Sequence, residues 1–311
     1  MPASALPPPA VQLIDVAPRD GLQNEKVDVD TATKLALIQA LLGTGLRRIE
    51  VASFVNPKRV PQMADAEAIC AALPAVADAR YAGLVLNAAG YERAKATGRL
   101  QDLNMVVCAT DSFGQRNQGQ TIAQGIEVVS AMARQARRDG LSAAVTVSVA
   151  FGCPFEGEVT VARVAEIAEA LAAAEPDEII LADTIGVAVP TQVRATIAAV
   201  RERVGDAIPL RGHFHNTRNT AVANVLAAYE AGVRRFDASV GGIGGCPFAP
   251  AATGNVATED LLYLFQRMGV DCGVDLAKLN EVARWMGEKL GRQLPGMVSR
   301  AGVFPPRFGD A

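Results

Sequence analysis

The chain has 311 residues, of which 50% are hydrophobic and 20% charged, and its formal net charge is −3. This length suffices for one large domain or two smaller ones. The absence of a long basic stretch argues against a nucleic-acid partner, and no apolar stretch reaches the ~18 residues of a membrane span. Five widely spaced cysteines without a CxxC motif favour a reduced, cytoplasmic protein over a zinc knuckle or a dithiol redox centre.

The first residues, 1–10, are rich in proline and alanine and contain no Lys or Arg. They lack both the charged, apolar pattern of a signal peptide and the arginines of a mitochondrial transit sequence, which again favours the cytoplasm. We expect a disordered leader over 1–10, one domain over 11–290, and a tail over 291–311 that either packs on the domain or a neighbouring subunit, or frays.

Short apolar, β-branched runs alternate with longer stretches rich in Ala, Leu, Glu and Arg. The strands are expected over 11–16, 48–52, 80–86, 102–108, 144–150, 178–182, 210–215 and 235–240. Helices are expected over 31–43, 160–174, 190–204, 220–231 and 275–290. Strands that each precede a helix within about 250 residues favour a (β/α)8 TIM barrel, with a doubly wound sheet as the alternative. The first strand is not followed by the GxGxxG pattern of dinucleotide-binding folds.

Polar residues occur at the strand ends where a barrel of this type carries its functional groups. Arg19 and Asp20 follow the first expected strand, Glu50 lies in the second, and Asp183 follows the sixth. A buried carboxylate is costly unless it is paired, so Glu50 predicts a polar partner inside the barrel. Arg19 could stabilise a developing oxyanion or form an ordinary ion pair with Glu50 or Asp183. Asp183 could orient a ligand or belong to a structural network.

The only two histidines of the chain, His213 and His215, end the seventh expected strand. Side chains two apart in a strand point to the same face, so both imidazoles could meet one metal ion. The alternative is one core and one surface histidine. With the carboxylate of Asp20 they would form a mixed site suited to Mg²⁺ or Mn²⁺, with Zn²⁺ or Co²⁺ also open. Otherwise, Asp20 and Gly21 form a common turn dipeptide.

The eighth strand leads into a segment with four glycines in five residues, 241–245, followed by Cys246. Such a loop is typical of a lid that closes over a substrate, and its thiol could transfer a proton there. An irregular connector is the alternative. Asn255 could offer its amide oxygen to a cation, but on its own it favours capping of the next helix. Glu259 suits the N-terminal end of that helix.

Together these segments resemble the 3-hydroxy-3-methylglutaryl-CoA lyase family of metal-dependent TIM barrels over about residues 11–290. The motifs that carry the resemblance are Pro18-Arg-Asp-Gly-Leu-Gln-Asn-Glu25, His213-x-His215, and Gly244-Gly-Cys-Pro-Phe-Ala249 followed by Gly254-Asn-Val-Ala-Thr-Glu-Asp260. The segments from Glu50 to Lys58 and from Leu181 to Val187 also look like family segments.

The resemblance implies roles for individual residues. The expected metal ligands are Asp20, His213, His215 and Asn255. The residues expected to act in catalysis are Arg19, Asp20, Glu50, His213 and Cys246. The residues expected to contact the substrate are Arg19, Gln23, Asn117, Asp183 and Arg218. Glu259 is expected to support the site.

The implied reaction is a retro-Claisen cleavage of an acyl-CoA, first of 3-hydroxy-3-methylglutaryl-CoA to acetyl-CoA and acetoacetate. A base takes the proton of a tertiary hydroxyl, the C–C bond breaks to give a ketone and a thioester enolate, and the enolate is then protonated. The identity of the base stays open among Asp20, His213 and a metal-bound water. The resemblance also implies a homodimer.

Two segments depart from the family pattern. Residues 216–220 read Asn-Thr-Arg-Asn-Thr where the family commonly has Asp-Thr-Tyr-Gly-Gln, and residues 110–117 differ from its Ser-Glu-Leu-Phe-x-Lys-Lys-Asn. Citramalyl-CoA and a longer branched glutaryl-CoA are therefore alternative substrates. A condensing enzyme of the isopropylmalate or homocitrate synthase type is disfavoured, because those chains usually carry a further domain and lack the GGCP segment. A non-catalytic barrel that binds metal or acyl-CoA is disfavoured by the intact site.

Overall fold

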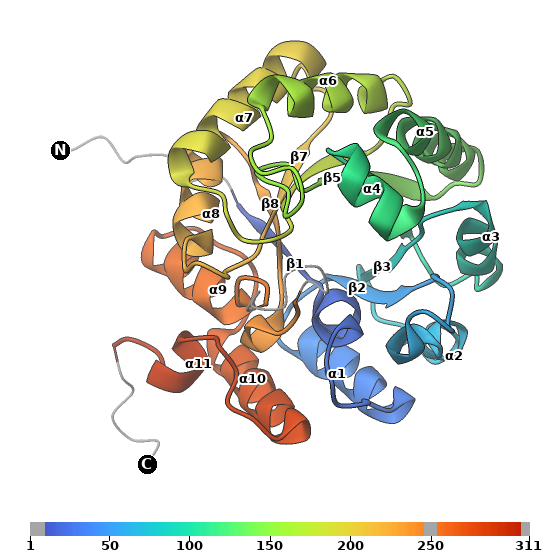
Figure 1. Cartoon of the computed structure of the whole chain (residues 1–311). Coiled ribbons are helices and arrows are strands. Elements are labelled where there is room, and N and C mark those ends of the chain that lie inside the picture. The colour runs from blue at the N-terminus through green and yellow to red at the C-terminus, as the bar shows by residue number, and fades with distance from the viewer. Residues whose placement is uncertain (1–9, 246–253, 306–311) are drawn as a thin grey trace.

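The computed structural model describes residues 10–245 and 254–305. Within this part, eight parallel strands form a closed barrel in which neighbours follow chain order and β8 closes onto β1. The strands are β1 (Gln12–Asp15), β2 (Arg48–Ser53), β3 (Arg80–Leu84), β4 (Asp102–Cys108), β5 (Ser142–Ser148), β6 (Glu178–Asp183), β7 (Leu210–Phe214) and β8 (Arg235–Ala238). Figure 1 shows the helices as an outer ring around these strands. The predicted TIM barrel is confirmed, and the doubly wound sheet is excluded.

The helices lie between and after the strands. They are α1 (Thr31–Gly43), α2 (Ala66–Ala71), α3 (Ala88–Ala96), α4 (Asp111–Gln118), α5 (Ile122–Arg138), α6 (Val161–Ala172), α7 (Pro190–Val204), α8 (Ala221–Glu230), α9 (Thr258–Arg267), α10 (Leu276–Leu290) and α11 (Val298–Ala301). The predicted bounds of α1 and α7 are confirmed at both ends. The Asp30 side chain accepts a hydrogen bond from the Thr33 amide and so caps α1. Pro190 begins α7, where its missing N–H is not needed.

The predicted strand bounds differ most where the chain bends. β5 begins at Ser142, two residues before the expected start, because Ser142 pairs with Asp102 of β4. It ends at Ser148, since Val149 takes a φ of 50° that turns the chain out of the sheet. β8 ends at Ala238, before the 3-10 turn η3 (Val240–Gly242). The apolar runs of the sequence indicate which residues are buried. Pairing with the neighbouring strands determines where each strand begins and ends.

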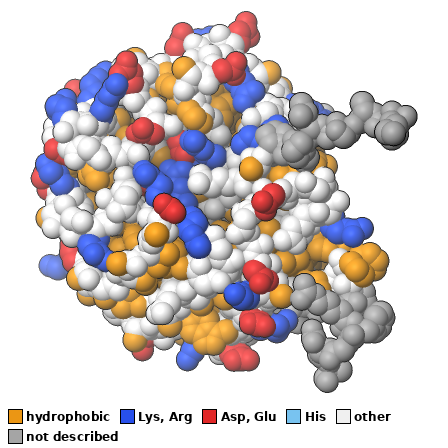
Figure 2. All heavy atoms as spheres, turned by 180° about the vertical axis from the view of Figure 1, so that it is seen from behind, with side chains coloured by type: hydrophobic (Ala, Val, Ile, Leu, Met, Phe, Trp, Pro, Cys, Tyr) orange, Lys and Arg blue, Asp and Glu red, His pale blue; other side chains and the backbone are white. Residues whose placement is uncertain are grey.

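The N-terminal end of the barrel interior is filled by charged side chains. Arg48, Asp102, Glu178 and Arg235 are the first residues of β2, β4, β6 and β8. They form one layer contributed by alternate strands, as the barrel geometry requires. Arg48 donates to Asp102 at 2.7 Å and to Glu178 at 2.5 Å, and Arg235 donates to Glu178 at 2.6 Å. Figure 2, which views the molecule from behind, shows Lys and Arg side chains gathered near the middle of that face.

The described part of the tail packs on the barrel domain. Leu294 and Ser299 are buried, and the Asp260 carboxylate of α9 accepts from the amides of Met297 and Val298. Residues 1–9 of the expected leader lie outside the described residues. In the part of the chain that is described, we find no helix with both the length and the apolar character needed to cross a membrane.

The charged layer predicts a large loss of stability when Glu178 is removed. Glu178→Ala leaves Arg48 and Arg235 without a hydrogen-bond partner that they share, and it removes one of the two ion pairs of Arg211, which lies 3.4 Å from Glu178. We expect the free energy of unfolding in urea to fall by about 3–5 kcal/mol. The control is Glu169→Ala, which breaks an exposed pair with Arg203 and should cost less than about 1 kcal/mol. Equal losses in the two variants would contradict this assignment.

Candidate active site

The loop after β1 carries Arg19 and Asp20 into the C-terminal mouth of the barrel. It forms the π-helical turn η1 (Ala17–Gly21), whose amides at Arg19, Asp20 and Gly21 all donate to the Val16 carbonyl. The fully buried Asp15 carboxylate anchors the start of this turn, because it accepts from the amides of Ala17 and Val240. The turn is therefore tied to the segment that follows β8.

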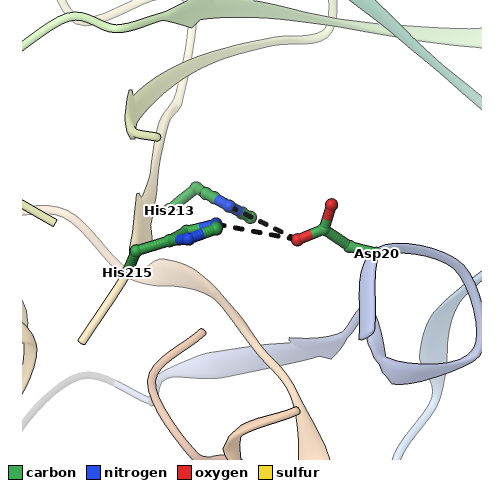
Figure 3. A group of neighbouring side chains, drawn as sticks. All are labelled: Asp20, His213 and His215. Carbon is green, nitrogen blue, oxygen red and sulfur yellow. Dashed lines mark ion pairs between the residues drawn. The ribbon is translucent and has the colours of Figure 1, made fainter. Parts of the chain in front are cut away.

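Asp20 lies against both histidines. Its Oδ2 is 3.9 Å from Nε2 of His213 and 3.8 Å from Nε2 of His215. Figure 3 shows both imidazoles reaching from β7 and its end toward this one carboxylate. One ligand atom from each of the three residues lies within 4.8 Å of the other two, the spacing of groups that could hold a metal ion. The structure thus brings together three of the four expected ligands.

Asn255 is the fourth expected ligand, and it also lies here. Its backbone bridges to His215, and its Nδ2 donates to Asp20 Oδ2 at 2.8 Å. The preference for helix capping that Asn255 showed on its own is wrong, because α9 begins at Thr258 with Ala257 as its N-cap. The amide nitrogen faces Asp20 in this structure, so contact with a cation through the oxygen requires a half-turn of the amide group.

Arg19 is held between two carboxylates. It donates from Nη1 to Asp20 Oδ1 and from Nε to Glu50 Oε2, both at 2.6 Å. Burial opposes ionisation of Asp20, but Arg19 and the two histidines hold the pKa of that carboxyl well below its usual value. Burial raises the pKa of Glu50, although Arg19 and Asn104 oppose the shift. The predicted polar partner of Glu50 is therefore confirmed as Arg19.

The two imidazoles differ in their second contact. His213 Nδ1 lies 3.1 Å from Asp237 Oδ2. Burial disfavours its charged form, but the hydrogen bond and charge of Asp237, together with Asp20, raise the pKa of His213. His215 Nδ1 is buried and has no hydrogen-bond partner among the described residues. Two imidazoles whose Nε2 atoms face one carboxylate, with the Asn255 amide beside them, form a donor set that fits a divalent cation.

Arg19, Asp20 and both histidines line a cavity of about 320 Å³. Gln23 and Asn117, two of the expected substrate contacts, line it, as does Gly245 at the start of the expected lid. The deeper wall combines apolar and polar side chains, namely Leu84, Asn104, Val106, Thr146, Ser148 and Ile180. A polar mouth above a partly apolar floor suits a ligand with one charged and one hydrocarbon part.

Two expected substrate contacts do not line this cavity. The Asp183 carboxylate accepts from the amides of Val187 and Ala188 at 2.9 and 3.0 Å. Arg218 donates to the carbonyls of Ile185 and Gly186. Both side chains therefore organise the loop after β6, so Asp183 plays the structural role that the sequence left open. Arg218 is not placed to meet a substrate carboxylate.

The family is decided by comparison with known proteins. The HMGL-like family model matches residues 10–286. The chain belongs to the HMGL-like family. It is 47% identical to the (R)-citramalyl-CoA lyase of Chloroflexus aurantiacus, with 95% of this chain and 96% of that protein covered. It is 40% identical to the hydroxymethylglutaryl-CoA lyase of Pseudomonas mevalonii, with 94% and 96% covered.

A solved structure shares the whole fold of this HMGL-like protein. An HMG-CoA lyase from Acinetobacter baumannii in complex with coenzyme A and 3-methylmalate superposes with a TM-score of 0.90 and 38% identity, covering 95% of this chain and 96% of the other. The resemblance inferred from the sequence is confirmed, and the protein is a carbon–carbon lyase. The rival assignments as a condensing enzyme or a non-catalytic barrel lose their support.

The glycine-rich segment expected to form a lid is described only in part. Gly241 to Gly245 are described, whereas the expected catalytic Cys246 lies outside the described residues. The amide of Gly241 donates to Glu259 Oε2 at 2.9 Å, and Glu259 is fully buried. Burial raises the pKa of Glu259 to about 7. Glu259 therefore holds the base of this loop, a stronger constraint than the helix-end role that the sequence suggested.

Sequence reasoning missed three polar residues inside the barrel. Asn104 donates to Glu50 at 2.6 Å, Arg211 donates to Asn104 at 3.0 Å, and Asp237 contacts His213. Like Glu50, they occupy positions within strands rather than at strand ends. A polar residue inside a buried strand was the available signal, and it was applied only to Glu50.

The buried state of Glu259 predicts a pH-dependent stability. Its folded pKa of about 7 exceeds the usual glutamate value of 4.5, so this group contributes most below pH 4.5 and its contribution is lost as the pH rises toward 7. Glu259→Gln should remove about 3 kcal/mol of pH dependence from the free energy of unfolding. Urea unfolding of the metal-free protein at several pH values measures this slope. The exposed Glu166→Gln serves as the control, and a Glu259→Gln slope equal to that of the wild type would refute the assignment.

Proposed function

We propose that this protein cleaves an acyl-CoA by a metal-dependent retro-Claisen reaction, with citramalyl-CoA as the preferred substrate and 3-hydroxy-3-methylglutaryl-CoA as the second candidate. The observation that carries the proposal is the convergence of Asp20, His213 and His215 beside Arg19 in one cavity. The complex of a related lyase with coenzyme A supports an acyl-CoA substrate. The motifs alone favoured 3-hydroxy-3-methylglutaryl-CoA, but the 47% identity to a citramalyl-CoA lyase reverses this order.

The proposed metal ligands are Asp20, His213, His215 and Asn255, with Mg²⁺ or Mn²⁺ as the metal because the set mixes oxygen and imidazole donors. When bound, a divalent cation lowers the pKa of the substrate hydroxyl and fixes its position. Two proposals remain. A cytoplasmic location is supported by the widely spaced cysteines, and a homodimer rests on the likeness to the family.

The remaining parts of the reaction are assigned to side chains of the protein itself. Arg19, fixed by Glu50 and Asp20, presents its guanidinium to the cavity, where it can stabilise the enolate oxygen of the departing thioester. Cys246 is proposed to return a proton to that enolate. Gln23 and Asn117 are proposed to contact the substrate. Asp183 and Arg218 would act on it only through the loop after β6.

The choice between the two acyl groups depends on one methylene. In citramalyl-CoA the carboxylate is attached directly to the carbon that bears the hydroxyl, whereas in 3-hydroxy-3-methylglutaryl-CoA a methylene separates them. The barrel wall that would face this difference includes Val106 and Ile180, which belong to paired, rigid strands. A fixed apolar wall typically discriminates one methylene by about 10- to 200-fold.

The proposal predicts metal-dependent release of acetyl-CoA from both substrates. We expect kcat/KM for citramalyl-CoA, which also yields pyruvate, to exceed that for 3-hydroxy-3-methylglutaryl-CoA, which yields acetoacetate, by about 10- to 200-fold. EDTA should abolish both activities, and Mn²⁺ should restore them. Protein shown to hold its metal that cleaves neither compound would reject the lyase proposal. A preference for the glutaryl compound would reject only the substrate order.

A second prediction concerns Arg19. Arg19→Gln removes the cation beside the developing enolate, so kcat should fall by about 100- to 1000-fold. Steady-state kinetics on the preferred acyl-CoA measures this loss, and Arg203→Gln, at an exposed ion pair, is the control. A change confined to KM would mean that Arg19 binds the ground state and the transition state equally.

A further inference from the structure

We propose that Asp237 and Arg211 are positioning residues that hold the metal ligand His213 and the cationic Arg19 in one rigid arrangement. This inference rests on the proposed metal site but not on the identity of the acyl-CoA. None of the motifs that define the likeness to the family contains either residue. Both lie within strands, β8 and β7, on the inside of the barrel below the cavity mouth.

The side chains form a closed ring of polar contacts. From Arg19 it passes to Glu50 at 2.6 Å, from Glu50 to Asn104 at 2.6 Å, and from Asn104 to Arg211 at 3.0 Å. From Arg211 it passes to Asp237 at 3.5 Å and on to His213 at 3.1 Å. Asp20 closes the ring, at 3.9 Å from His213 and 2.6 Å from Arg19.

Asp237 determines how His213 meets a metal. A carboxylate that accepts from Nδ1 fixes the imidazole tautomer, so that the lone pair lies on Nε2. In this structure Nε2 is the atom that faces Asp20. His215 has no such partner on its Nδ1 among the described residues. The protein therefore orients one of its two imidazoles by a charged contact, and that one is His213.

Arg211 stabilises the buried charge of Asp237 that this contact requires. Its side chain is fully buried, and it faces Asp237, Asn104 and Glu178. The distances of 3.4 and 3.5 Å to the two carboxylates are long, so Arg211 offsets the charge of Asp237 without taking the oxygen that His213 uses. Through Asn104 it also fixes the second oxygen of Glu50. One guanidinium thus supports both the metal side and the Arg19 side of the site.

The test is Mn²⁺ affinity, measured by calorimetry on the purified full chain without substrate. Asp237→Asn keeps the shape of the side chain and removes its charge, and we expect Mn²⁺ to bind about 10- to 100-fold more weakly. The matched control is Asp102→Asn, which alters an equally buried carboxylate between two arginines at the opposite end of the barrel. It should lower stability but leave Mn²⁺ affinity within about twofold of the wild type, because Arg211 of the ring pairs with Glu178 and not with Asp102.

A second variant distinguishes the effect of the carboxylate's position on Mn²⁺ affinity from the effect of its charge. Asp237→Glu keeps the charge beside Arg211, and hence stability, but displaces the carboxylate from His213 by one methylene. A positioning role predicts that Mn²⁺ affinity still falls, whereas a purely charge-balancing role predicts full affinity. Wild-type affinity in both Asp237 variants would overturn this inference alone. Failure of the wild-type protein to bind Mn²⁺ would overturn the proposed metal site as well.

The link to Arg19 is tested by combining Asp237→Asn with Glu50→Gln. Contacts within one network give non-additive effects, so the double variant should lose less Mn²⁺ affinity than the product of the two single losses, by more than about threefold. Strict multiplication of the single losses would show that the two halves of the ring act independently, and it would overturn the role assigned to Arg211.

Discussion

The structure depends on the pairing of charges that are removed from water inside the barrel. Each buried carboxylate would be costly alone, and the fold meets this cost with arginines projecting from neighbouring strands. The charged layer at the N-terminal end and the ring beneath the active site are not separate, because Arg211 faces Glu178 of the first and Asp237 of the second. The same electrostatic compensation therefore stabilises the barrel and fixes the geometry of the candidate metal site.

Two further buried carboxylates, Asp15 and Glu259, hold the loops around the site to this interior. Asp15 accepts from amides on both sides of the site, at Ala17 before Arg19 and at Val240 after β8, and burial raises the pKa of its carboxyl to about 7. Glu259 accepts from Gly241 at the base of the glycine-rich segment. The turn that carries Asp20 and the segment that leads toward Cys246 are therefore both held by buried carboxylates. These contacts preorganise the site without touching a ligand.

The sequence predicted the barrel and the grouping of Asp20 with the two histidines because both follow from local patterns. Alternating strands and helices fix the fold, and the spacing of His213 and His215 places them on one face of a strand. The ring could not be predicted in this way. Asn104, Arg211 and Asp237 come from three strands, and their contacts depend on barrel closure and register, which no local pattern encodes. Asn255 on its own predicted a helix cap. The sequence does not distinguish an Asn that caps a helix from one that, as here, lies two residues before the N-cap.

Asp20 contacts Arg19 and also belongs to the candidate metal site. Its charge therefore affects how strongly Arg19 can act on a substrate. In this structure Arg19 divides its donors between Asp20 and Glu50, and the negative charges of these two carboxylates weaken the attraction of the guanidinium for a developing enolate. If Asp20 instead directs its charge toward a cation, Arg19 is compensated mainly by Glu50, and its remaining donors can serve the substrate. Glu50 then has to hold the guanidinium alone, which explains why its other oxygen is fixed by Asn104 and, through it, by Arg211. The ring would therefore contribute most to the position of Arg19 when a cation is bound.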